Sequence, residues 1–226
     1  MPTPELMQDA RKFVFDHFRE QGVPPILEQF MERSHLSRAE AFEILQALEA
    51  AHHLKLVPGT QRILMAFPFS AIATPFRVHA DGKTYYANCA WDSVAFHAML
   101  DAPTRIESRC HHCASAVTVE LAGGRMTRAT PSEPLVYLAL PAAKWWEDIV
   151  NTCSNHMVFF LSREHLAAWE VANPNAKGEA LTVEQTHRLG FPIYKDKMKL
   201  EYARPSKDAL VAHFASLGLT DDFWRL

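Results

Sequence analysis

The chain has 226 residues, which suits one large domain, or one domain with a small appendage, and is enough to bury a sizeable core. It is 48% hydrophobic and 22% charged and carries a formal net charge of −3, an ordinary composition for a globular protein. Because the chain is slightly acidic, there is no general electrostatic reason to expect nucleic acid or an anionic membrane as its partner.

The compartment follows from what the sequence lacks. The first 23 residues intersperse four acidic residues among apolar ones, which is unlike a secretory signal. No run reaches the roughly 18 apolar residues that span a bilayer. We therefore expect a cytoplasmic protein whose four cysteines stay reduced. In a chain of this kind, metal binding or catalysis is a better explanation for the cysteines than disulfide bonds are.

The first 68 residues predict a helical module that ends in a hairpin. Ser37 with Glu40 three residues later forms a capping-box pattern at the start of the third helix. Pro58-Gly59 marks the turn of the hairpin. The predicted helices cover residues 4–22, 26–35 and 36–54, and the hairpin covers 54–67. Three helices and a hairpin favour a winged-helix-like module, residues 1–68.

The charges of this module argue against DNA binding. Residues 1–62 hold nine acidic and seven basic side chains, and the candidate recognition helix carries Glu40, Glu43 and Glu49 against Arg38. A helix that faces phosphates normally shows the opposite balance. We therefore expect the module to have a structural or substrate-covering use, and we expect nucleic acid to be an unlikely partner.

The remaining residues, 69–226, predict an α+β domain with mainly antiparallel sheet. Asp81-Gly82 and Gly123-Gly124 are hairpin signals between short apolar or alternating segments. Short helical patterns lie between the strands, and this order indicates a sheet with interleaved helices. The strands are expected within 76–88, 104–110, 116–129, 134–141 and 157–161, and the helices over 89–101, 143–155, 162–173, 182–190 and part of 206–224.

The segment "NCAWDS" places Cys89 three residues before Asp92, where a strand gives way to a helix. A thiol at a helix N-terminus is expected to have a lowered pKa, and Asp92 one turn later reaches the same small volume. Two interpretations are open: a nucleophilic thiol whose proton the carboxylate handles, or a buried inert cysteine beside a carboxylate that caps the helix. The spacing alone favours the second.

Cys110 and Cys113 form a C-x-x-C that encloses His111 and His112. That spacing suits zinc or a redox pair, with further ligands from the other cysteines, from His111 or His112, or from His156. A structural role is equally compatible with the pattern. The fourth thiol, Cys153, lies at the end of the helix predicted over 143–155 and precedes the apolar segment "MVFF". It is either a core residue or one of the further metal ligands.

These segments resemble the organomercurial (alkylmercury) lyase family, in order, from about residue 75 to 195. The match rests on "YYANCAWDSVAF", "RIESRCHHCASAVTVEL" and "TCSNHMVFF", which is followed by a long helical stretch. The family's Cys-x-x-Asp corresponds to Cys89 and Asp92, and a family cysteine considered structural corresponds to Cys110. Its second active cysteine points to Cys153, although an ungapped match from the Phe-Phe pair places that cysteine on Ser154.

The resemblance implies a carbon–mercury lyase with Cys89, Asp92 and Cys153 as catalytic residues and no added cofactor. The soft thiolates of Cys89 and Cys153 would bind the mercury of a small organomercurial. Asp92 would deliver a proton to the leaving carbon. Cytosolic thiols would then accept Hg(II), which implies a role in mercury resistance and detoxification. Trp91, Phe96 and Phe159 are candidates to shield the site.

Two alternatives remain at this stage. The first is a relative of the lyase family with a different thiol-dependent reaction, since the second thiol is displaced by one residue. The second is a metal-binding or sensor protein that uses Cys110 and Cys113, which are also candidates for a structural or metal site.

Overall fold

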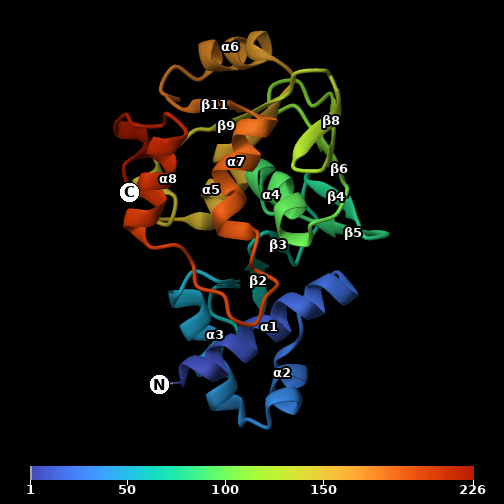
Figure 1. The fold of residues 1–226 in the computed structure, drawn as a ribbon, viewed down its shortest axis with the longest axis vertical. Helices are drawn as coiled ribbons and strands as arrows, with labels where there is room; N and C mark the ends of the chain where they lie inside the picture. The colour runs from blue at the N-terminus through green and yellow to red at the C-terminus, as the bar shows by residue number, and fades with distance from the viewer. Residues whose placement is uncertain (1) are drawn as a thin grey trace.

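The computed structural model describes residues 2–226 and shows mixed helix and antiparallel sheet (Figure 1). The N-terminal part begins with helices α1 (Pro4–Gln21), α2 (Leu27–Ser34) and α3 (Arg38–Ala50). Ser37 caps α3 and Glu40 returns a hydrogen bond to the Ser37 backbone N–H at 2.9 Å, so the predicted capping box is present. The apolar faces of α1 and α3 meet around the buried side chains of Val14 and Ile44.

A small antiparallel sheet follows these helices. It consists of β1 (Lys55–Leu56), β2 (Ile63–Ala66) and β3 (Phe69–Ser70) in the order β1-β2-β3. Phe69 in β3 stacks on Phe18 of α1 with ring centroids 5.0 Å apart. The sheet thereby connects the N-terminal helices, at the bottom of Figure 1, to the larger body above them.

The largest sheet has five antiparallel strands in the order β5-β4-β6-β7-β8. Along β6 and β7, inward and outward residues alternate, as expected for a sheet with one covered face. The predicted hairpins at Asp81-Gly82 and Gly123-Gly124 join β4 to β5 and β7 to β8. The strands are β4 (Arg77–Ala80), β5 (Lys83–Tyr86), β6 (Thr104–Arg109), β7 (Ala116–Ala122) and β8 (Arg125–Thr130).

A third sheet lies in the upper part of the molecule (Figure 1). Its strands are β9 (Leu135–Leu138), β10 (Met157–Phe160) and β11 (Glu179–Thr182), all antiparallel, in the order β10-β9-β11. Every residue of β9 and β10 is buried, which explains why these strands are continuously apolar in the sequence.

Helix α4 is the central helix of this body. All of its residues are buried, and it packs against α7 and against the five-stranded sheet (Figure 1). The helices of this part are α4 (Ala90–Leu100), α5 (Ile149–His156), α6 (Arg163–Ala172), α7 (Val183–Tyr194) and α8 (Lys207–Ser216), with 3-10 turns at Ala142–Lys144 and Asp222–Trp224.

The elements agree with the sequence expectation except at the ends of some helices and at two short strands; the helix expected over 36–54, for example, ends at Ala50. The helix expected over 143–155 begins only at Ile149, because the Asp148 side chain caps it by accepting the Asn151 N–H at 3.1 Å. Helix α7 continues to Tyr194, past the expected end at 190. Strands β3 and β11 were not expected. The α+β class with mainly antiparallel sheet is confirmed.

Within residues 2–226, no helix combines the length and the apolar character that crossing a membrane would need.

Candidate active site

Cys89 is the N-cap residue of α4 and is separated from β5 by Ala87 and Asn88. Its extended backbone turns the chain into the helix, and its sulfur accepts the Asp92 backbone N–H at 3.2 Å. The side chain is only 1% exposed. The Cys89 sulfur also lies 3.9 Å from the Met157 sulfur, at the start of β10. The predicted strand-to-helix position of this thiol is therefore correct.

Asp92 is buried one turn into α4 and is held by two hydrogen-bond donors. The Tyr194 hydroxyl donates to one carboxylate oxygen at 2.5 Å, and the Asn88 amide donates to the other at 2.9 Å. Asn88 also donates to the Pro68 carbonyl at 3.0 Å, which fixes the amide between the two acceptors. Both carboxylate oxygens are thus oriented by residues from outside the helix turn.

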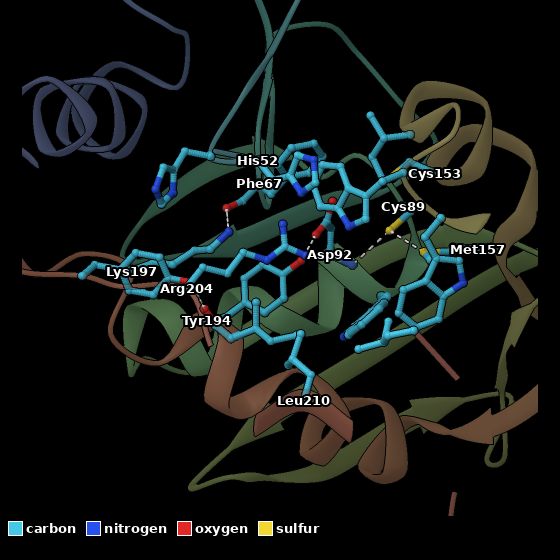
Figure 2. A pocket seen from close by; sticks show the side chains of 18 of the residues that line it. His52, Phe67, Cys89, Asp92, Cys153, Met157, Tyr194, Lys197, Arg204 and Leu210 are labelled. Atoms are coloured by element: carbon cyan, nitrogen blue, oxygen red, sulfur yellow. Dashed lines mark hydrogen bonds between the residues drawn. The ribbon is translucent and has the colours of Figure 1, made fainter. Parts of the chain in front are cut away.

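Cys153 completes the cluster from α5. The two sulfurs of Cys89 and Cys153 and a carboxylate oxygen of Asp92 all lie within 4.8 Å of one another (Figure 2). Cys153 is buried on the inner face of α5, whereas Ser154 is exposed on the outer face. The structure therefore brings Cys153, and not Ser154, to the other two predicted residues.

Burial controls the protonation of this cluster. Desolvation raises the pKa of Cys89 well above its ordinary value, and the nearby Cys153 and Asp92 raise it further. For Cys153, the hydrogen bond with Cys89 favours the thiolate, but burial and Asp92 outweigh it, and its pKa is raised. The expected lowering of the Cys89 pKa by the helix N-terminus is wrong, because desolvation exceeds the effect of the backbone N–H.

The pKa of Asp92 is raised as well, because burial disfavours its charged form more than Tyr194 and Asn88 favour it. Burial also raises the pKa of Tyr194 well above its usual range, so that hydroxyl remains a donor. The cluster therefore holds two thiols that keep their protons and a carboxyl group that can accept or hold one. Such a set can move a proton within the site.

Two cations from the C-terminal segment face the same cavity. The Lys197 ammonium donates to the Phe67 carbonyl at 2.7 Å and lies 4.5 Å from the Tyr194 ring centroid. Burial lowers the pKa of Lys197 to about 7. The Arg204 guanidinium lies 4.5 Å from the Trp146 ring centroid. Within residues 2–226, no protein group hydrogen-bonds to Arg204 Nη1, which is itself buried.

The cluster opens into a cavity with a largely aromatic wall (Figure 2). Trp91 is one of its members, but Phe96 and Phe159, the other expected shielding residues, are fully buried in the core instead. The N-terminal part contributes His52 and His53, and the His52 ring stacks on Trp146 at a centroid distance of 3.9 Å. The aromatic members of the wall are Phe67, Trp91, Trp145, Trp146, Tyr194, Tyr202 and Phe214.

Cys110 and Cys113 lie elsewhere, in the turn between β6 and β7. Neither of them lines the cavity. Their sulfurs lie within 4.8 Å of each other and of a ring nitrogen of His165 in α6. His165 was not among the ligands considered from the sequence.

The sequence interpretation also missed Tyr194, Lys197 and Arg204. Tyr194 is 102 residues from the carboxylate that it contacts, and no local pattern marks that pairing. The one available signal was weak: an aromatic residue and a lysine spaced i, i+3 near the end of a predicted helix.

Comparison with known proteins identifies the family. The alkylmercury lyase family model matches residues 69–195, which is more than half of the chain. The chain therefore belongs to the alkylmercury lyase family.

Individual relatives are distant. The chain is 26% identical over 148 residues to an alkylmercury lyase of Staphylococcus epidermidis, with 66% of each chain covered. It is 29% identical over 144 residues to one of Pseudomonas putida, covering 62% of this chain and 66% of the relative. Over 119 residues it is 29% identical to one of Bacillus cereus, covering 53% of each. The chain thus matches slightly under two thirds of the length of the first two relatives and about half of the third.

A solved structure shares the fold. The mercury-bound form of MerB2 superposes with a TM-score of 0.68 at 20% identity, covering 88% of this chain and 93% of that chain. At that identity the likeness supports the fold, including the N-terminal part that the family model does not match.

Proposed function

We propose that the protein cleaves carbon–mercury bonds by protonolysis, with Cys89, Asp92 and Cys153 as its catalytic residues. The observation that carries the proposal is the buried cluster, whose two sulfurs and one carboxylate oxygen lie within 4.8 Å of one another. Thiolates are the preferred ligands of a soft cation such as Hg(II). Membership of the alkylmercury lyase family supports the same chemistry.

The groups in the cavity account for each proton that moves and each bond that forms or breaks in this reaction. The Cys89 thiol exchanges with the thiolate on R–Hg–SR′, which gives Cys89–S–Hg–R and releases R′SH. Cys153 then passes its proton to Asp92 and binds the mercury as a thiolate. Asp92 delivers that proton to the carbon as the Hg–C bond breaks, which yields R–H and Cys89–S–Hg–S–Cys153. Two further cytosolic thiols remove Hg(II) and return both cysteines to the protonated form.

The environment of Asp92 suits this role. A carboxyl group whose pKa is raised by burial holds a proton more readily than an exposed one does. Tyr194 and Asn88 fix its oxygens, so the carboxyl is a positioned proton carrier. The aromatic wall excludes water from the reacting carbon and accepts apolar R groups.

For the chain as a whole, we propose two units: a winged-helix-like module over 1–68 and a catalytic domain over 69–226. The module covers the cavity of the catalytic domain. Support comes from His52 and His53, which reach the cavity from the first unit. The acidic balance of that unit supports this covering use over binding to nucleic acid. A reducing cytoplasm is the compartment in which the free thiols and a thiol acceptor for Hg(II) would persist, in keeping with mercury detoxification.

The test is the release of hydrocarbon from an organomercurial in the presence of excess thiol. Wild-type protein should release R–H, and Cys89→Ser, Asp92→Asn and Cys153→Ser should each lose activity by about a hundredfold or more, as expected for removing a nucleophile or proton carrier. Ser154→Ala is the matched control, because Ser154 lies on the exposed face of α5 and should leave turnover unchanged. A wild-type protein without turnover would refute the proposed activity, and full turnover in Cys153→Ser would remove that residue from the mechanism.

A further inference from the structure

A second group of metal-binding side chains lies outside the cavity, at the turn that joins β6 to β7. The sulfurs of Cys110 and Cys113 and one ring nitrogen of His165 all lie within 4.8 Å of one another. The Cys110 sulfur is 4.0 Å from His165 Nδ1, across 55 residues of sequence. Cys110 is buried, His165 is half-buried and Cys113 is exposed, so the group is anchored on one side and open to solvent on the other.

The backbone holds this arrangement. The Cys110 N–H donates to the Ser115 carbonyl at 2.8 Å, and the Ala114 N–H donates back to the Cys110 carbonyl at 2.9 Å. The turn is also attached to β10, because the His111 N–H donates to the Phe159 carbonyl at 2.8 Å. Helix α6 follows β10 almost immediately and carries His165 in its first turn. Both sides of the cluster are therefore fixed relative to the same strand.

The donor atoms select the kind of ligand. Two sulfurs and one imidazole nitrogen suit zinc and similar thiophilic cations, whereas calcium and magnesium require oxygen ligands. In a tetrahedral site with bonds of about 2.0–2.3 Å, neighbouring ligand atoms are roughly 3.4–3.8 Å apart. The observed separations exceed this range by about 1 Å at most, which side-chain rotation can supply.

We propose that Cys110, Cys113 and His165 bind a thiophilic divalent cation of the zinc class, with water in the fourth position. Binding releases one proton from each thiol, since only thiolates coordinate such ions. The cation joins the β6–β7 turn to the first turn of α6. This site is separate from the Cys89, Asp92 and Cys153 cluster, and none of its three ligands lines the catalytic cavity.

The test is cobalt binding to the full-length protein, after chelator treatment and with a phosphine reductant so that no small thiol competes. Cobalt(II) bound by thiolates gives a sulfur-to-metal charge-transfer band and intense visible bands, which report the ligand set directly. Because the catalytic cysteines could also take cobalt, the titration is carried out in wild type, Cys89→Ser, Cys113→Ser, His165→Ala and His112→Ala. Zinc should displace the cobalt and abolish the bands.

We expect the bands to persist in Cys89→Ser and to be lost in Cys113→Ser and in His165→Ala. His112→Ala is the matched control: its imidazole is exposed in the same turn but is not one of the three ligands, so its bands should persist. Bands that disappear in Cys89→Ser but remain in Cys113→Ser would place the metal in the catalytic cavity and overturn the proposal. The absence of thiolate bands in wild type would overturn it as well.

A second readout does not depend on spectra. A zinc concentration of a hundred times Kd should raise the Tm of wild type by roughly 5–10 °C, because the ion binds the folded state. The shift should be absent in Cys113→Ser and present in His112→Ala. Equal shifts in both variants would mean that the turn is not the binding site.

Discussion

At the scale of single residues, the cavity combines the buried thiols and carboxyl group of the cluster with a guanidinium that has a buried, unpaired nitrogen. Arg204 faces the cavity from the C-terminal segment, and within residues 2–226 no protein group hydrogen-bonds to its buried Nη1 (Figure 2). A buried donor without a partner is costly, and a guanidinium matches a carboxylate in geometry and charge. The cavity should therefore favour organomercurials whose R group is both aromatic and anionic.

This preference can be measured with two arylmercurials that differ only in a carboxylate. For wild type, kcat/KM should be higher for the carboxylated compound. In Arg204→Met, the ratio of the two kcat/KM values should fall by about tenfold to a hundredfold, the worth of one charge-assisted hydrogen bond. Turnover of the uncharged compound is the internal control. An unchanged ratio would show that Arg204 does not contact the substituent.

Lys197 gives a prediction about pH. Burial lowers its pKa in the folded protein from 10.5 to about 7. Between these two values the unfolded chain binds more protons at this site than the folded one, so this group makes stability rise with pH above about 7. Below pH 7 both states are protonated, and the cost of burying the charge is fully present.

Urea unfolding of wild type and Lys197→Met at pH 6, 7, 8 and 9 tests this directly. The free energy of unfolding of wild type, relative to that of Lys197→Met, should increase by up to roughly 1.4 kcal/mol per pH unit above pH 7. The cysteines are common to both proteins, so their contribution largely cancels. Lys195→Met is the matched control, since Lys195 is exposed on the same segment and its curve should run parallel to that of wild type. Parallel curves for Lys197→Met would contradict the prediction.

At the scale of elements, the close packing of α4 on α7 depends on a glycine. A Cβ atom added at Gly190 of α7 would lie 2.5 Å from Trp91 Nε1 in α4. The indole cannot easily move, because Trp91 also packs edge-to-face on Trp145 at 5.1 Å between centroids. Because Gly190 has no side chain, the two helices can approach closely, and space remains for the Trp91 indole in the cavity wall beside Cys89.

Gly190→Ala should therefore destabilise the protein by about 1–3 kcal/mol, the usual cost of overpacking, despite the better helix propensity of alanine. Urea unfolding measures the loss. The cost of Gly190→Ala should be smaller by about 1 kcal/mol in a Trp91→Phe background, since phenylalanine lacks Nε1. An equal cost in both backgrounds would mean that contact with the indole is not the cause.

The sequence predicted the helices and strands better than it predicted the contacts between them. The capping box of Ser37 and the Asp81-Gly82 hairpin are local signals, and both are found in the structure. Strand β11 escaped prediction because its four residues are defined by pairing with β9, some 40 residues away. The helix containing Cys153 starts six residues later than expected, because Asp148 caps it.

The sequence predicted the site only where the residues that act together are close to one another in the chain. Cys89 and Asp92 lie one helical turn apart, so their spacing predicts their proximity. Whether Cys153 or Ser154 faces them depends on the rotation of α5, which tertiary packing sets. Tyr194 and His165 reach their partners across 102 and 55 residues, a distance over which sequence patterns carry no positional signal.

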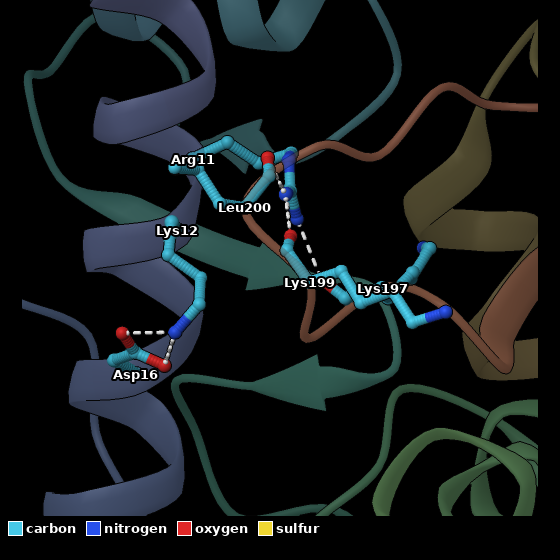
Figure 3. Close-up of polar contacts among 6 residues, drawn as sticks. All are labelled: Arg11, Lys12, Asp16, Lys197, Lys199 and Leu200. Carbon is cyan, nitrogen blue, oxygen red and sulfur yellow. Dashed lines mark hydrogen bonds and ion pairs between the residues drawn. The ribbon is translucent and has the colours of Figure 1, made fainter.

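At the scale of the whole molecule, the N-terminal helices are tied to the segment that carries the cavity's cations. Arg11 of α1 is 1% exposed and donates to the carbonyls of Lys197, Lys199 and Leu200 (Figure 3). The contact to Lys197 is 2.5 Å and that to Leu200 is 2.9 Å. One buried side chain from the first helix therefore fixes the backbone from which Lys197 reaches the cavity.

Arg11→Met should lower the free energy of unfolding by about 3 kcal/mol, because it removes charge-assisted hydrogen bonds and leaves carbonyl groups without a donor. Lys12→Met is the matched control on the next residue of the same helix. Its partner Asp16 is part of a half-exposed i, i+4 pair, which should contribute only about 0.3–0.5 kcal/mol (Figure 3). Urea unfolding of the two variants measures both values.

Measurements of KM can distinguish a positioning role of Arg11 from a purely stabilising one. If Arg11 positions the segment that carries Lys197 and Arg204, then Arg11→Met, assayed well below its Tm, should raise KM for a carboxylated arylmercurial more than for an uncharged one. The reason is that Arg204, which contacts the carboxylate in our proposal, lies on the displaced segment. Lys12→Met should leave both KM values unchanged. Equal changes in KM for the two compounds would limit the role of Arg11 to stability.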